Sequence, residues 1–201
     1  MSKLRVLVAC EYSGRVRQAF RDLGHEAWSC DLLPSDDNSE FHVTGDIDSM
    51  LKQNWDLLIA HTPCTYLANS GVSHLHKDAT RWPKLFDGAA FFKKFIDATH
   101  IPMRVIENPI MHKYGKSLIG GVNQDQVIQP WMFGHTEQKA TCLWLFGLDK
   151  LIPTNNVKDE MMLLPKNERQ KLHYLPPTPD RWKLRSTTYQ GFADAMASQW
   201  G

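Results

Sequence analysis

The first 31 residues contain the pattern that most restricts the fold: a strand, a glycine turn, a helix, a second strand and an acid. Residues 4–9 form a β-rich apolar run, and the turn after them ends at Gly14. Apolar residues then recur at helical spacing over 15–23, and residues 25–30 predict a second strand that ends at Asp31. A helix between two such strands indicates a mostly parallel, doubly wound α/β sheet, because a parallel connection needs a crossover.

The same pattern predicts a cofactor site at the carboxyl ends of these strands. A glycine turn lets the backbone approach a cofactor closely, and an acid such as Asp31 can bind ribose hydroxyls. Gly14 is the single glycine of this turn, whereas a fingerprint that cradles a pyrophosphate has several. This difference favours S-adenosylmethionine over NAD. A plain strand–helix–strand unit without any ligand stays open as the alternative.

Two further apolar runs end in reactive side chains. Residues 57–60 predict a buried strand that is followed by Pro63 and Cys64, and residues 103–106 predict a strand followed directly by Glu107. Because adjacent parallel strands end at one edge of a sheet, we expect the thiol and the carboxylate in one cleft beside the cofactor turn. A buried structural cysteine beside a proline turn is the alternative to a nucleophile.

Composition narrows the class of protein. The 201 residues are 42% apolar and 22% charged, which is ordinary for a globular chain, and we expect one domain over 1–201 with an irregular basic excursion at 150–185. The net charge of +1 argues against a histone-like binder but allows a local basic face. Four cysteines without a CxxC pair predict neither a metal site nor a disulfide framework. With no long apolar run, the cytoplasm is the expected location, without membrane contact.

Four segments, taken in chain order, resemble the cytosine-C5 DNA methyltransferases. Residues 9–14 are similar to the family's glycine-containing S-adenosylmethionine turn, and Gly45-Asp46-Ile47 resembles its Gly-Asp-Ile element. Pro63-Cys64 resembles the Pro-Cys pair that carries the nucleophile, and Glu107-Asn108 resembles the Glu-Asn element that contacts the target cytosine.

Two later segments match this family more loosely. Residues 137–141 resemble its Gln-x-Arg-x-Arg element, with Lys139 where arginine is usual, and residues 188–196 resemble the closing cofactor-side element that includes Ala193. Residues 147–185 are far too short for the family's target-recognition domain. The chain is therefore most similar to the short forms found in phage and prophage genomes.

The resemblance implies an enzyme that methylates cytosine C5 in DNA with S-adenosylmethionine, through a covalent adduct with the nucleophile. A protein partner could supply target recognition. The implied catalytic residues are Cys64, Glu107 and Lys139. The implied cofactor-binding residues are Glu11, Tyr12, Gly14, Asp31, Asp46, Pro63 and Ala193. The implied substrate-binding residues are Asn108, Arg181 and Arg185.

Two other functions stay open on sequence grounds. The same chemistry could act on a free pyrimidine nucleotide or on RNA, which the missing recognition domain favours. Alternatively, the chain could be a non-catalytic relative that binds DNA or protein, although a binder has no chemical need for Cys64 and Glu107. His61, three residues before the cysteine, is either a second cation that lowers the thiol pKa, beside Lys139, or a plain turn residue.

Overall fold

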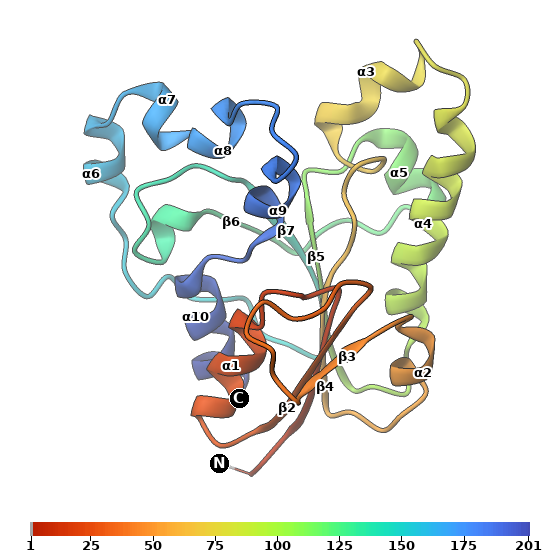
Figure 1. Cartoon of the computed structure of the whole chain (residues 1–201), viewed down its shortest axis with the longest axis vertical. Helices are drawn as coiled ribbons and strands as arrows, with labels where there is room; N and C mark the ends of the chain where they lie inside the picture. The colour runs from red at the N-terminus through yellow and green to blue at the C-terminus, as the bar shows by residue number, and fades with distance from the viewer. Residues whose placement is uncertain (1) are drawn as a thin grey trace.

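A single seven-stranded sheet organises residues 2–201, which are the part of the chain that the computed structural model describes (Figure 1). The strand order is β3-β2-β1-β4-β5-β7-β6. The first five strands are parallel to their neighbours, β7 runs antiparallel to β5, and β6 runs antiparallel to β7. The strands are β1 (Arg5–Ala9), β2 (Glu26–Asp31), β3 (His42–Thr44), β4 (Leu57–His61), β5 (Met103–Pro109), β6 (Gln126–Ile128) and β7 (Thr141–Phe146). The prediction of a mostly parallel α/β sheet is confirmed.

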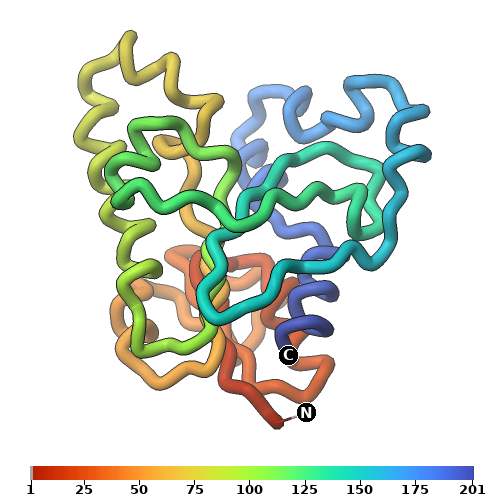
Figure 2. Tube along the Cα trace, turned by 180° about the vertical axis from the view of Figure 1, so that it is seen from behind, coloured from red at the N-terminus to blue at the C-terminus, as the bar shows by residue number. Residues whose placement is uncertain are grey.

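Helices cover both faces of this sheet (Figures 1 and 2). On one face lie α1 (Arg15–Asp22) and α10 (Gln190–Trp200), and on the other lie α2 (Asp48–Leu51), α4 (Arg81–Asp97) and α5 (Lys113–Leu118). The pleat of β1 explains the division, because successive side chains of a strand point to opposite faces. Val6 and Val8 pack in the core with α1 and α10, whereas Leu7 and Ala9 pack in the core with α4.

The segment expected as an irregular excursion, residues 150–185, consists of four short helices joined by irregular stretches, and we call it the four-helix segment. It contains α6 (Lys158–Leu163), α7 (Lys166–Arg169), α8 (Lys171–Tyr174) and α9 (Arg181–Ser186). None of these helices exceeds six residues, which is too short to show a helical repeat of apolar residues.

Short helical turns also occupy the loops around the sheet's carboxyl edge. They are η1 (Asn69–Gly71) and α3 (Val72–Leu75) after β4, and η2 (Pro130–Met132) after β6. Figure 1 shows α3 and the start of α4 on one side of this edge, and α6 to α9 on the other. Within residues 2–201, no helix is both long enough and apolar enough to cross a membrane.

Candidate active site

His61 and Glu107 lie side by side at the carboxyl ends of β4 and β5. The two residues are directly paired in the register of the parallel strands. The imidazole Nδ1 donates to Oε2 of the carboxylate over 3.3 Å, and the two side chains are 8% and 18% exposed. Parallel pairing therefore brings together two titratable groups that are 46 residues apart in sequence.

Thr62 and Asn108, which follow this pair, form a clamp between the two strands. The Asn108 Nδ2 donates to the backbone oxygen of Thr62 over 3.1 Å and to its Oγ1 over 3.0 Å. The Thr62 hydroxyl in turn donates to the backbone oxygen of Glu107 over 3.1 Å. Asn108 is completely buried. Its structural role is to hold the loop that carries Cys64, because Thr62 lies two residues before the thiol.

Cys64 is half-buried in this loop, and its backbone oxygen accepts hydrogen bonds from the amides of Leu67 and Ala68. Burial raises the pKa of its thiol, and the negative charge of Glu107 raises that pKa further. The positive charges of Lys139 and Arg185 act in the opposite direction without reversing the result. The thiol is therefore protonated at neutral pH. Lys139 and Arg185 nevertheless lie near enough for their charges to favour the thiolate.

For the Glu107 carboxyl, the groups that lower the pKa outweigh the effect of burial. Burial would raise the pKa of its carboxyl, but the hydrogen bond from His61 and the positive charges of Lys139 and His61 lower it overall. Glu107 is therefore a carboxylate at neutral pH, held among cationic partners.

A small pocket joins these groups to the C-terminal part of the chain. Lys139 lies in the loop before β7, and its Nζ donates to the backbone oxygen of Arg185 over 2.9 Å. The pocket is lined by His61, Glu107, Lys139, Thr141, Ser186, Thr188, Tyr189, Phe192 and Met196. The sequence analysis expected Cys64 and Glu107 in one cleft; Glu107 lines this pocket together with Lys139, whereas Cys64 is not among the lining residues. Residues 188–196 were expected on the cofactor side, and Thr188, Tyr189, Phe192 and Met196 of this stretch line the pocket.

Glu11 has a structural task in the turn between β1 and α1. Its carboxylate accepts the backbone N–H groups of Val16 and Arg17 over 2.7 and 3.2 Å, and the residue is 3% exposed. These amides belong to the first turn of α1, where N–H groups lack partners within the helix. Glu11 therefore caps the helix, a role that the sequence analysis did not assign. Gly14 takes a left-handed conformation with φ of 69°, and a Cβ there would overlap the Arg17 side chain.

Tyr12 connects the β1–α1 turn to α9. Its hydroxyl lies 2.7 Å from the backbone oxygen of Lys183, to which it donates, and 3.1 Å from the hydroxyl of Ser186. The ammonium of Lys183 pairs with Asp36 at 2.6 Å, and Arg15 donates to the backbone oxygen of Thr188 over 2.8 Å. The end of the four-helix segment is therefore tied to the β1–α1 turn on one side and to Lys139 on the other.

Two carboxylates that were predicted to bind the cofactor lie at the end of β2 and just after β3. Asp31 is half-buried and accepts the amide of Leu33 over 3.0 Å, and burial raises its pKa. Asp46 is exposed and accepts the amide of Asp48 over 2.8 Å. Burial raises the pKa of the Cys10 thiol, and the charges of Asp31 and Asp46 raise it further. Both acids therefore lie near the end of β1. A carboxylate at the end of the second strand suits the hydroxyls of a nucleoside.

The remaining predicted residues are more dispersed. Pro63 is exposed beside Cys64, whereas Ala193, a residue of α10, is completely buried in the core, where its methyl group packs against protein. Arg181 donates to the backbone oxygens of Leu175 and His173, which stabilises the four-helix segment. Arg185 is exposed.

Among residues 2–201, no group of three His, Cys, Asp or Glu side chains is placed to hold a metal ion. The sequence analysis missed Thr62. A signal for it existed, because it places a hydroxyl two residues after the predicted strand 57–60.

The fold is that of solved methyltransferase structures. One is described as a DNA modification methyltransferase encoded within a prophage of E. coli; it is 14% identical, with a TM-score of 0.50, over 82% of this chain and 56% of that one. Another is the methyltransferase EhMeth of Entamoeba histolytica, 15% identical with a TM-score of 0.53, over 78% of this chain and 58% of that one. The chain thus spans less than three fifths of either structure. No protein-family model matches the sequence, and no curated protein matches it.

Proposed function

We propose that this protein transfers a methyl group from S-adenosylmethionine to C5 of cytosine in DNA, with Cys64 as the nucleophile. The observation that carries the proposal is that Glu107 and Lys139 line one pocket at the carboxyl edge of a methyltransferase-type sheet, with Cys64 near enough for the charges of both to act on the pKa of its thiol. Ligands of open α/β sheets bind at this edge.

Cys64 passes its thiol proton to the Glu107 carboxylate and adds its sulfur to C6 of the cytosine ring, because C5 is otherwise too weak a nucleophile. Burial and Glu107 hold the thiol in its protonated form, so the free protein protects it from side reactions. Lys139 and Arg185 supply the positive charge that stabilises the thiolate once a substrate excludes water from the pocket. The new S–C6 bond makes C5 electron-rich.

Glu107 faces the edge of the ring that gains charge in this step. The electron pair displaced by the sulfur moves toward N3 and O2, so an acid at N3 lowers the barrier. S-Adenosylmethionine, when bound, supplies the electrophilic methyl group that C5 takes. Loss of the C5 proton to water expels the Cys64 sulfur, and the N3 proton returns through Glu107 to that sulfur, which restores both the ring and the enzyme.

The cofactor would lie between the β1–α1 turn and the acids at the ends of β2 and β3. Asp31 is suited to the ribose hydroxyls, and Asp46 stands exposed beside it. Tyr12 offers an aromatic ring, although its hydroxyl is engaged by the backbone of Lys183. Glu11 would act indirectly, through the position of α1.

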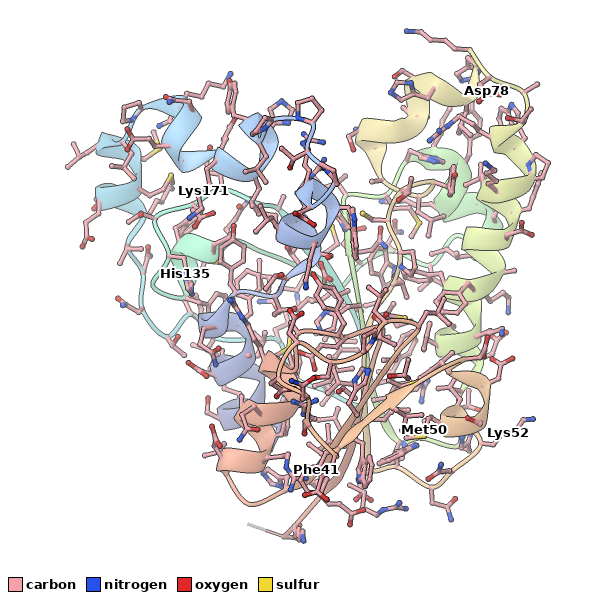
Figure 3. All side chains as sticks on the ribbon, in the orientation of Figure 1. Phe41, Met50, Lys52, Asp78, His135 and Lys171 are labelled. Atoms are coloured by element: carbon pink, nitrogen blue, oxygen red, sulfur yellow. The ribbon has the colours of Figure 1, made fainter. Side chains whose placement is uncertain are left out.

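The distribution of charge supports a polyanionic substrate. Residues 150–188 contain eight Lys or Arg and four Asp or Glu, a net charge of +4. Residues 66–84 and 110–118 together contain five Lys or Arg and one Asp, again +4. Because the whole chain carries +1, the other residues carry −7. The two basic segments flank the carboxyl edge of the sheet; Lys171 lies on one side and Asp78 on the other (Figure 3).

Aromatic side chains lie among these charges. Trp182 on α9 is 54% exposed and Tyr174 on α8 is 52% exposed, which suits stacking on unpaired bases. On the other side, Arg81 lies over the ring of Tyr66 at 4.8 Å. Lysine and arginine on both sides of Cys64 would neutralise phosphates of a strand that presents its base to the pocket. A protein partner could still add sequence recognition.

The experiment is methyl transfer from labelled S-adenosylmethionine to unmodified DNA, run in parallel with RNA and cytidine nucleotides. Cys64→Ala is the test variant, and Cys142→Ala, which removes a thiol buried in β7 opposite Asn108, is its matched control. Label at C5 in DNA that disappears only with Cys64→Ala supports the proposal. Label in RNA or in nucleotide alone would show that the same chemistry acts on that substrate instead of DNA. Absence of label in all three substrates rejects the catalytic proposal in favour of a binding protein.

A further inference from the structure

The pocket beside Glu107 is nearly closed. Its free volume of about 10 Å³ is room for about one water molecule. A cytosine base is several times larger than a water molecule. If a base is to reach Glu107, as the proposed function requires, part of the pocket wall has to move.

One part of this wall can move without disturbing the sheet. Three of the lining residues belong to β4, β5 and β7, and two are buried side chains of α10. Tyr189, the residue before α10, is anchored because its hydroxyl donates to the Glu137 carboxylate over 2.6 Å. The remaining wall consists of Lys139 and of the end of α9 with the chain that follows it. We call residues 182–188 the gate segment.

Polar contacts hold the middle of the gate segment in this closed position. The Tyr12 hydroxyl donates to the backbone oxygen of Lys183 over 2.7 Å, and the Lys183 ammonium pairs with Asp36 at 2.6 Å. On the pocket side, the Lys139 ammonium donates to the backbone oxygen of Arg185 over 2.9 Å. A helix of six residues has little stability of its own, so α9 depends on contacts of this kind.

The two ends of the gate segment are attached separately. Arg181, which precedes it, donates to the backbone oxygens of Leu175 and His173. At the other end, Arg15 donates to the backbone oxygen of Thr188 over 2.8 Å. Loss of the contacts in the middle therefore releases only a short stretch of chain between two fixed points.

We infer that DNA opens this gate, an inference that rests on the proposed function. The Lys183 and Asp36 side chains are 43% and 42% exposed, so solvent weakens their pair and a phosphate can replace the carboxylate. The exposed Arg185 offers a second phosphate contact on the same segment. Movement of α9 toward the DNA backbone frees Lys139 from the Arg185 oxygen and opens the pocket to the base. Without DNA, the gate segment closes the pocket.

This mechanism has a consequence that a merely structural or DNA-binding role of the same residues would not have. When only a minor, open state of a protein binds its ligand, the apparent affinity is reduced by the fraction that is open. A substitution that weakens the closed state should therefore strengthen DNA binding. Loss of a DNA contact, or of a contact that stabilises the fold, would weaken binding or leave it unchanged.

The test compares wild-type protein with Tyr12→Phe, which removes the hydroxyl without a change of charge, and with Asp36→Asn. Asp48→Asn is the matched control for the second variant, because Asp48 pairs with Lys94 at the same 2.6 Å and is similarly exposed. The affinity for a single-stranded DNA oligonucleotide that contains cytosine is measured by fluorescence anisotropy without S-adenosylmethionine. Amide hydrogen exchange of residues 182–188 is measured in the free proteins.

We expect Tyr12→Phe to bind the oligonucleotide about 2–10-fold more tightly than wild type, the factor that one net hydrogen bond represents. Asp36→Asn should bind about 2–5-fold more tightly than Asp48→Asn, as for an exposed ion pair. Exchange of residues 182–188 should accelerate by similar factors in both test variants and not in the control.

Unchanged or weaker DNA binding by Tyr12→Phe, or unchanged exchange of residues 182–188 in both test variants, would overturn the gate. Neither measurement involves methyl transfer. A failure of the proposed function would therefore be seen separately, as a wild-type protein that labels no cytosine substrate.

Discussion

Asn108 is predicted to act through the fold and not through contact with substrate, and a substitution series can separate these roles. Asn108→Ala removes both bonds to Thr62 and leaves the threonine oxygens without their buried donor. Two net hydrogen bonds plus one buried unsatisfied acceptor correspond to about 2–6 kcal/mol. Asn108→Asp keeps the shape but directs a carboxylate at two oxygens 3.0–3.1 Å away, which should cost about 3–5 kcal/mol.

The assay is equilibrium unfolding in urea, with Asn54→Ala as an exposed control that should stay within about 0.5 kcal/mol of wild type. The melting temperature of Asn108→Asp should fall by about 10 °C, since 1 kcal/mol corresponds to roughly 2–4 °C in a chain of this size. Methyl transfer should fall in both Asn108 variants, because Thr62 no longer holds the Cys64 loop. An Asn108→Asp protein as stable as wild type but deficient in substrate binding would refute the clamp.

Three further predictions concern the same edge of the sheet. Glu11→Ala should lower the free energy of unfolding by about 2–4 kcal/mol in urea, since it uncaps α1; unchanged stability with weaker S-adenosylmethionine binding would instead restore a direct cofactor role. Gly191→Ala should destabilise by at least about 1–3 kcal/mol on thermal melting, because its Cβ would overlap the backbone oxygen of Phe133, and a neutral result would contradict the packing of α10. Alkylation of Cys64 by iodoacetamide should be slower at pH 7 than that of a free cysteine and should rise with pH, since burial and Glu107 raise the thiol pKa. Lys139→Met should raise that pKa further, and faster alkylation in this variant would contradict the assignment.

The parallel sheet could be predicted because its signals are local. The run over 57–60 is apolar on both faces and ends at once in a turn, and the structure gives a strand there with all four residues buried. Once strands and crossovers are recognised, the carboxyl edge follows from topology. That is why the sequence alone could place Glu107 on a strand of this edge and Cys64 just after the neighbouring strand.

The details of the site depend on contacts between distant residues, which local patterns do not encode. The Tyr12 hydroxyl donates to the backbone oxygen of Lys183, 171 residues away, and Lys139 donates to that of Arg185, 46 residues away. The cap formed by Glu11 is local, but a glutamate before a helix usually indicates only a favourable charge. Short helices such as α7 carry too few residues for periodicity to distinguish them from irregular structure.

The most direct test of the central claim is covalent trapping on DNA that contains 5-fluorocytosine, in the presence of S-adenosylmethionine. Fluorine at C5 cannot leave as a proton does, so the sulfur that has added to C6 stays attached to the ring. The account predicts a stable protein–DNA adduct whose peptide map places the base on Cys64, absent from Cys64→Ala and retained in Cys142→Ala. An adduct on another residue, or efficient methylation of ordinary cytosine by Cys64→Ala, would contradict it.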